Sequence, residues 1–146
     1  MDTNRIQETM DELAIRKINA RYFYAVDSGN EEDYLKVWTS EGVSMGDNGS
    51  ANGHQELRQS FRRMQQNLSR NKRHFVGNLI IDIDGDSATQ HCYLVVLERK
   101  EAAKVVATAA YEDELVRTSD GWKFSKRKIS VDPSFSYSPT PKSTSD

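Results

Sequence analysis

The spacing of apolar residues in the first part of the chain is helical. Apolar residues recur at steps of three and four over residues 10–26, the period of one face of an α-helix. Thr9 and Glu12 form a capping box, and Gly29 supplies a C-terminal stop signal. The pattern therefore predicts one long amphipathic helix over residues 9–28.

Two shorter helices are predicted after it. Asn30 can cap a short helix whose first turn carries the acidic residues 31–33, which suits the positive end of the helix dipole. A third helix is expected over residues 54–69, because apolar residues there fall on one stripe. The stripe consists of Leu57, Phe61, Met64 and Leu68.

From residue 74 onward the period of the apolar positions changes to two, as in half-buried strands. Four long strands are expected over residues 74–83, 88–99, 104–117 and 122–131. The segments Asp84-Gly85-Asp86 and Ser119-Asp120-Gly121 are tight turns, so the strands form an antiparallel meander. Residues 42–46 can add a short strand, and the composition of residues 47–53 predicts a loop.

Helices that precede a run of strands are typical of an α+β fold. A long twisted sheet that curls over helices leaves a cone, and its wide end can hold a ligand. We therefore predict one cone-shaped α+β domain over residues 1–132, with three N-terminal helices packed in a curved, mostly antiparallel sheet. Residues 133–146 are rich in Ser, Pro and Thr, which predicts a disordered tail.

The length, charge and hydropathy of the chain indicate a single domain and argue against nucleic acid and membranes as binding partners. A chain of 146 residues suits a single domain, and 29% charged residues suit a solvated surface. The net charge of −2 does not draw the protein to nucleic acid or to anionic lipid. No apolar run approaches the roughly 18 residues of a membrane span, and residues 1–12 lack the apolar region of a secretory signal. We expect a cytoplasmic protein.

Asp27 and His74 are the strongest candidates for chemistry. Asp27 ends the first predicted helix, where the helix dipole disfavours an acid, and His74 opens the first long strand. If folding brings the two side chains together in an apolar pocket, they form a general base with an orienting carboxylate. Either residue can instead be structural, since Asp27 can begin a solvated turn and a histidine at a strand start can simply pack.

Two other candidates depend on which face of a strand they occupy. His91 and Tyr93 alternate with Cys92, Leu94 and Val96. If those three apolar residues face inward, His91 and Tyr93 face outward. The sequence leaves both arrangements open.

The sequence signals no metal site and no cofactor. No two histidines lie at ligand spacing, and Cys92 is the single cysteine. The segment Asp82–Asp86 resembles a calcium loop, but its glycine comes too early and no glutamate closes it, so a hairpin is the better interpretation. A thiol in an apolar strand has a raised pKa, which argues against Cys92 as a nucleophile.

Five segments, in this order, resemble the SnoaL-like proteins of the nuclear transport factor 2-like superfamily. They are Ile15–Asn30, Trp38–Val43, Arg73–Asn78, Asp84–Ala88 and Tyr111–Phe124. The resemblance covers most of the chain. It implies a cystatin-like α+β barrel, a pocket between sheet and helices, and a homodimer or homotrimer.

Within that superfamily the chain is most similar to the branch that holds scytalone dehydratase and hexachlorocyclohexane dehydrochlorinase. In both, an aspartate at the end of the first helix orients a histidine at the start of a long strand. Asp27 and His74 match these positions. The two tyrosines and the second histidine of the dehydratase are not retained. They correspond to Val26, Met45 and Glu98.

The resemblance implies a cofactor-independent lyase, a dehydratase or a related eliminating enzyme, with His74 as the base and Asp27 as its partner. The substrate is expected to be apolar, and aromatic or polycyclic. The alternatives are an isomerase or cyclase of the same fold, or a non-catalytic ligand-binding or assembly subunit, such as the small chain of a ring-hydroxylating dioxygenase. The aromatic candidates for substrate contact are Tyr24, Trp38, Tyr93 and Tyr111.

Overall fold

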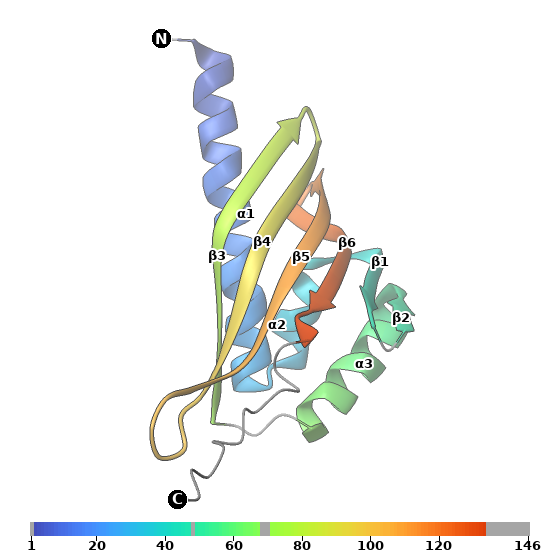
Figure 1. The fold of residues 1–146 in the computed structure, drawn as a ribbon. Helices are drawn as coiled ribbons and strands as arrows, with labels where there is room; N and C mark the ends of the chain where they lie inside the picture. Colours follow the sequence, from blue (N-terminus) through green and yellow to red (C-terminus); the bar gives the residue numbers. More distant parts are fainter. Residues whose placement is uncertain (1, 48, 68–70, 134–146) are drawn as a thin grey trace, which may run out of the picture.

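A computed structural model describes residues 2–47, 49–67 and 71–133 of the protein (Figure 1). Helices precede the long strands, as predicted. The helices are α1 (Thr3–Ser28), α2 (Glu31–Lys36) and α3 (Gly53–Asn67). The strands are β1 (Trp38–Gly46), β2 (Gly49–Asn52), β3 (Lys72–Asp84), β4 (Ser87–Glu98), β5 (Lys104–Thr118) and β6 (Gly121–Val131).

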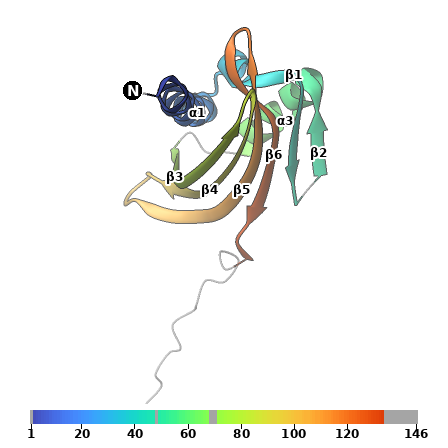
Figure 2. The same cartoon turned by 90° about the horizontal axis from the view of Figure 1, so that it is seen from above.

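The described strands form one mixed sheet in the order β2-β1-β6-β5-β4-β3. Strands β3 to β6 are the predicted antiparallel meander, and β1 runs parallel to β6. The sheet is strongly curved, and α1 lies alongside β3 (Figure 2). Because β3 is the last strand in the order, one of its edges is free to face the helix.

The first helix is longer than predicted, and the predicted capping box is wrong. The helix begins at Thr3, because the side chain of Asp2 accepts a hydrogen bond from the Asn4 backbone N–H at 3.1 Å. Thr9 lies inside the helix and donates its hydroxyl to the Arg5 carbonyl oxygen at 2.8 Å. The predicted C-terminus is confirmed, since Gly29 adopts the left-handed conformation with φ of 71°.

The prediction of a loop over residues 47–53 is also wrong. Gly49–Asn52 forms β2, which pairs antiparallel with the end of β1. Gly49 has φ of 118°, a conformation that favours glycine. Turn-forming composition therefore marked a hairpin whose second strand, the four-residue β2, carries too few apolar residues to show a period.

The two shorter helices follow the prediction. The Asn30 side chain caps α2 by accepting from the Asp33 backbone N–H at 3.0 Å. On α3, Leu57 and Phe61 are buried and Met64 is partly buried. The fourth residue of the predicted stripe, Leu68, lies outside the described residues, as does the predicted tail from residue 134 onward.

The burial of alternate residues on β4 shows which side chains face the inside of the sheet. Cys92, Leu94 and Val96 are buried against the helices, whereas His91 and Tyr93 point to the outer face. Burial raises the pKa of the Cys92 thiol to about 11, which does not suit a nucleophile. Among the described residues, none of the helices has the length and apolar character needed to cross a membrane.

The N-terminal half of α1 is fastened to the β5–β6 hairpin by a buried carboxylate. Asp11 accepts two hydrogen bonds of 2.7 Å from Arg117 and one of 3.0 Å from the Trp122 indole N–H. The Arg117 guanidinium, aided by Trp122, holds the pKa of Asp11 at about 2, below its usual value of 3.8. These hydrogen bonds hold the N-terminal half of α1 against the β5–β6 hairpin.

We expect Asp11→Asn to reduce the free energy of unfolding by about 2 kcal/mol at neutral pH. Because folding lowers the pKa of Asp11, its contribution is complete above about pH 4 and is lost as the pH falls toward 2. The difference between wild type and variant should therefore shrink by roughly 1 kcal/mol between pH 6 and pH 3 in urea unfolding. Asp86→Asn is the control, since Asp86 also pairs with Arg117 but is 84% exposed. An equal loss at both pH values for Asp11→Asn would contradict this account.

Candidate active site

Asp27 and His74 meet at the junction of α1 and β3. The Nδ1 atom of His74 lies 2.6 Å from Oδ1 of Asp27, and the His74 backbone N–H donates to Oδ2 at 3.2 Å. Their side chains are 13% and 9% exposed, respectively. The carboxylate therefore holds both the imidazole ring and the strand that carries it.

Local structure explains how this contact forms. Asp27 lies in the last turn of α1, just before the stop at Gly29, so its side chain reaches past the helix end. His74 lies near the start of β3, and β3 is an edge strand whose backbone groups on one side have no partner strand. Asp27 satisfies one such N–H group.

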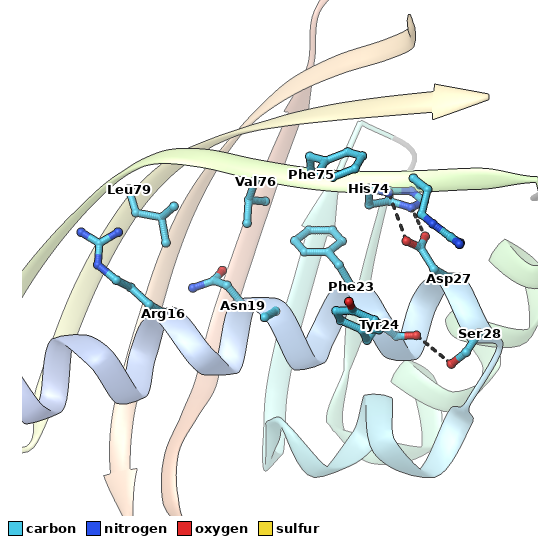
Figure 3. A pocket seen from close by; sticks show the side chains of 12 residues that line it. Arg16, Asn19, Phe23, Tyr24, Asp27, Ser28, His74, Phe75, Val76 and Leu79 are labelled. Atoms are coloured by element: carbon cyan, nitrogen blue, oxygen red, sulfur yellow. Dashed lines mark hydrogen bonds and ion pairs between the residues drawn. The ribbon is translucent and has the colours of Figure 1, made fainter. Parts of the chain in front are cut away.

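Phe23 supports the imidazole from α1. Its ring stacks on His74 with centroids 5.7 Å apart and planes 14° apart. Phe23 lies one helical turn before Asp27, so both side chains project from the same face of α1 (Figure 3). Phe23 was not among the predicted site residues, although its four-residue spacing from Asp27 was a usable signal.

A groove of about 700 Å³ runs between α1 and β3 and contains the dyad. We call it the α1–β3 groove. Side chains between Arg16 and Ser28 form its α1 wall, and residues 73–76 with Leu79 form its β3 wall. Figure 3 shows Arg16 and Leu79 at one end and Asp27 and His74 at the other. The groove is mainly apolar, with its reactive pair at one end.

The four aromatic residues predicted to contact the substrate lie in different parts of the structure. Tyr24 lines the groove and is 78% exposed. Trp38 and Tyr111 do not line it, because both are buried in the aromatic core beneath α1. Tyr93 is 61% exposed on the outer face of the sheet, which corrects the prediction that it lines the pocket. The aromatic nature of a residue does not by itself predict whether its side chain lies in the core, in the groove or on the outer face of the sheet.

A buried polar network lies behind the groove and was not predicted. Asn19, which lines the groove, forms a reciprocal amide pair with Gln90, with distances of 2.6 and 3.0 Å. Gln90 also donates to Asp113 at 2.6 Å. Asp113 accepts from Arg127 at 2.9 and 3.0 Å, and both side chains are at most 1% exposed.

Aromatic rings enclose the Arg127 guanidinium. Its Cζ atom lies 4.1 Å from the Tyr111 ring centroid, 4.2 Å from that of Phe124 and 4.5 Å from that of Tyr22. Burial raises the pKa of the Asp113 carboxyl, and the Arg127 charge acts in the opposite direction. A paired charge and stacked rings thus form a rigid base for Asn19 and Phe23.

Comparison with known proteins agrees with this architecture. The SnoaL-like domain matches residues 7–128, which is most of the chain. The protein belongs to the SnoaL-like family. A protein of unknown function with a cystatin-like fold from Nostoc punctiforme PCC 73102 is 36% identical, with 86% of this chain and 93% of that chain covered and a TM-score of 0.81. The predicted α+β fold is confirmed.

Proteins named after dehydratases occur among the structural neighbours of this SnoaL-like protein. A scytalone dehydratase-like protein from Novosphingobium aromaticivorans is 18% identical, covers 86% of both chains and has a TM-score of 0.75. A protein named LinA is 18% identical, with 88% of this chain and 90% of that chain covered and a TM-score of 0.77. At this identity the likeness concerns the fold. The predicted resemblance to SnoaL-like proteins is confirmed by the family match over residues 7–128.

Proposed function

We propose that this SnoaL-like protein is a small-molecule lyase that needs no cofactor, with His74 as general base and Asp27 as its orienting partner. The observation that carries the proposal is the 2.6 Å contact between His74 Nδ1 and Asp27 Oδ1 at one end of an apolar groove. A carboxylate beside one ring nitrogen leaves the other nitrogen to act on a substrate.

The chemistry follows from the direction of this hydrogen bond. Neutral His74 donates its Nδ1–H to Asp27, so the lone pair on Nε2 is available to take a proton from substrate carbon. Ionised Asp27 then stabilises the imidazolium that forms. The electron pair left on carbon expels a leaving group from the adjacent carbon, such as hydroxide, halide or alkoxide, and a double bond forms. The proton on His74 can neutralise a departing oxygen.

The walls of the groove support an apolar, aromatic substrate. Phe23, Phe75, Val76 and Leu79 line it, and Tyr24 adds a phenol at its rim. A flat ring can lie along these side chains with an acidic C–H directed toward His74. The same base can return its proton at another carbon, which would make the reaction an isomerisation.

The proposal is tested by incubating the purified protein with small aromatic and polycyclic compounds that carry an acidic C–H next to a leaving group. Mass spectrometry and NMR of the products separate elimination from isomerisation, because only elimination lowers the mass. We expect activity with wild type and about 10²- to 10⁴-fold less with the His74→Ala variant. Full activity in both His74→Ala and Asp27→Asn would overturn the proposed mechanism. The homo-oligomer and the cytoplasmic location stay predictions.

A further inference from the structure

The α1–β3 groove has three charged side chains in its lining, and two of them have partners. Asp27 is paired with His74, and Arg16 is paired with Glu12 at 2.6 Å. Arg73 has neither an ion pair nor a hydrogen bond from its side chain to any described residue. The groove therefore presents one unengaged positive charge next to the reactive pair.

The edge position of β3 explains why Arg73 can face this groove. Neighbouring residues on a strand point to opposite sides, so Arg73 and Phe75 project away from His74 and Val76. All four nevertheless line the groove, because α1 lies beside the edge of the sheet and the groove wraps around that edge. A ligand held at the edge can contact His74 on one side and Arg73 on the other.

The positive charge at this site is local. The whole chain has a net charge of −2, so the protein as a whole does not attract anions. The nearest acidic side chain in the groove is Asp27, whose oxygens are both engaged by His74. Any preference for an anionic ligand must then come from Arg73, with a smaller contribution from Arg16.

We propose that Arg73 is a specificity-determining residue that binds a carboxylate on the substrate, so that the substrate class is an aromatic carboxylic acid. This inference rests on the proposed function for the choice of site, but it concerns binding alone. The planar guanidinium can form two parallel hydrogen bonds with a carboxylate, while Phe75 and Val76 contact the ring.

The test compares two probes of the same shape. The anion 2-naphthoate and its neutral amide, 2-naphthamide, are titrated into the full-length protein by isothermal titration calorimetry at low salt. We expect wild type to prefer the anion by about ten-fold, equivalent to about 1.4 kcal/mol. Arg73→Met should remove this preference and leave the affinity for the amide nearly unchanged, and Arg73→Lys should retain part of it.

Two further variants locate the effect. Arg63→Met removes an equal charge from the exposed surface of α3, outside the groove, and should leave the preference intact. Arg16→Met should cost less than Arg73→Met, because Glu12 already engages Arg16. The NMR signals of His74 should shift on addition of 2-naphthoate, which places the ligand in the groove.

Several outcomes overturn the proposal. These are binding of neither probe at millimolar concentration, equal binding of both, an unchanged preference in Arg73→Met, or an equal loss in Arg16→Met. Binding that leaves His74 unshifted also counts against it. His74→Ala should keep the anion preference although it lacks most of the activity, so a failure of the carboxylate assignment is distinguishable from a failure of the proposed lyase function.

Discussion

Replacing His74 with alanine is expected to lower turnover by about 10²- to 10⁴-fold, the contribution of a positioned general base. The substitution removes the nitrogen that takes the substrate proton. The groove is otherwise retained, because its walls come from α1 and the rest of β3. Steady-state kinetics on the substrate found in the screen measure the effect, and circular dichroism checks the fold.

The matched control is His91→Ala. His91 lies on the neighbouring strand β4 but points to the outer face of the sheet, so turnover should be unchanged. Asp27→Asn should lower turnover by about 10²-fold, because the amide no longer stabilises an imidazolium and can donate to Nδ1, which favours the wrong tautomer. Normal kinetics in His74→Ala would show that the dyad is structural.

Replacing Asp113 with alanine is expected to reduce the free energy of unfolding by about 3–5 kcal/mol, the largest stability effect we foresee. Asp113 and Arg127 are at most 1% exposed and form two hydrogen bonds with each other. Removal of the carboxylate leaves a charged guanidinium buried among aromatic rings without its counter-ion. It also removes the acceptor that Gln90 uses. Urea unfolding at neutral pH measures the loss.

Glu114→Ala is the control for this prediction. Glu114 is the next residue on β5, and it pairs with Lys126 on the surface, where the two side chains are 58% and 41% exposed. Its loss should cost less than about 1 kcal/mol. The double variant Asp113→Leu with Arg127→Met should recover much of the stability, because neither charge is then buried alone. Equal losses in Asp113→Ala and Glu114→Ala would contradict a special role for the buried pair.

Much of the fold was predictable because its signals are local. The helical stripe before Gly29 and the two-residue period after His74 predicted α1 and the four long strands to within a few residues at most ends. The start of α1 was missed because its first two turns are exposed and contain one apolar residue, Ile6, so they carry no apolar stripe. Strand β2 was missed because it has four residues, which is below the length at which a period is visible.

The pairing within the buried polar network could not be predicted from the sequence, for a different reason. Asn19, Gln90, Asp113 and Arg127 occupy inward positions on α1, β4, β5 and β6. Each is a polar residue in a segment where the period predicts an apolar one, which is a usable signal. Which of them pair cannot be derived from periodicity, since their partners lie 14 to 108 positions away.

From its residues alone, this chain specifies the order of its elements, the family it resembles and two candidate residues, Asp27 and His74. Those features depend on side-chain period, turn chemistry and motif spacing, which are properties of neighbouring residues. Only the folded protein decides that the two candidates touch, that Tyr93 faces outward, and that Arg73 shares a groove with His74. These contacts depend on how α1 lies against the free edge of β3, and that arrangement is set by the packing of the whole sheet.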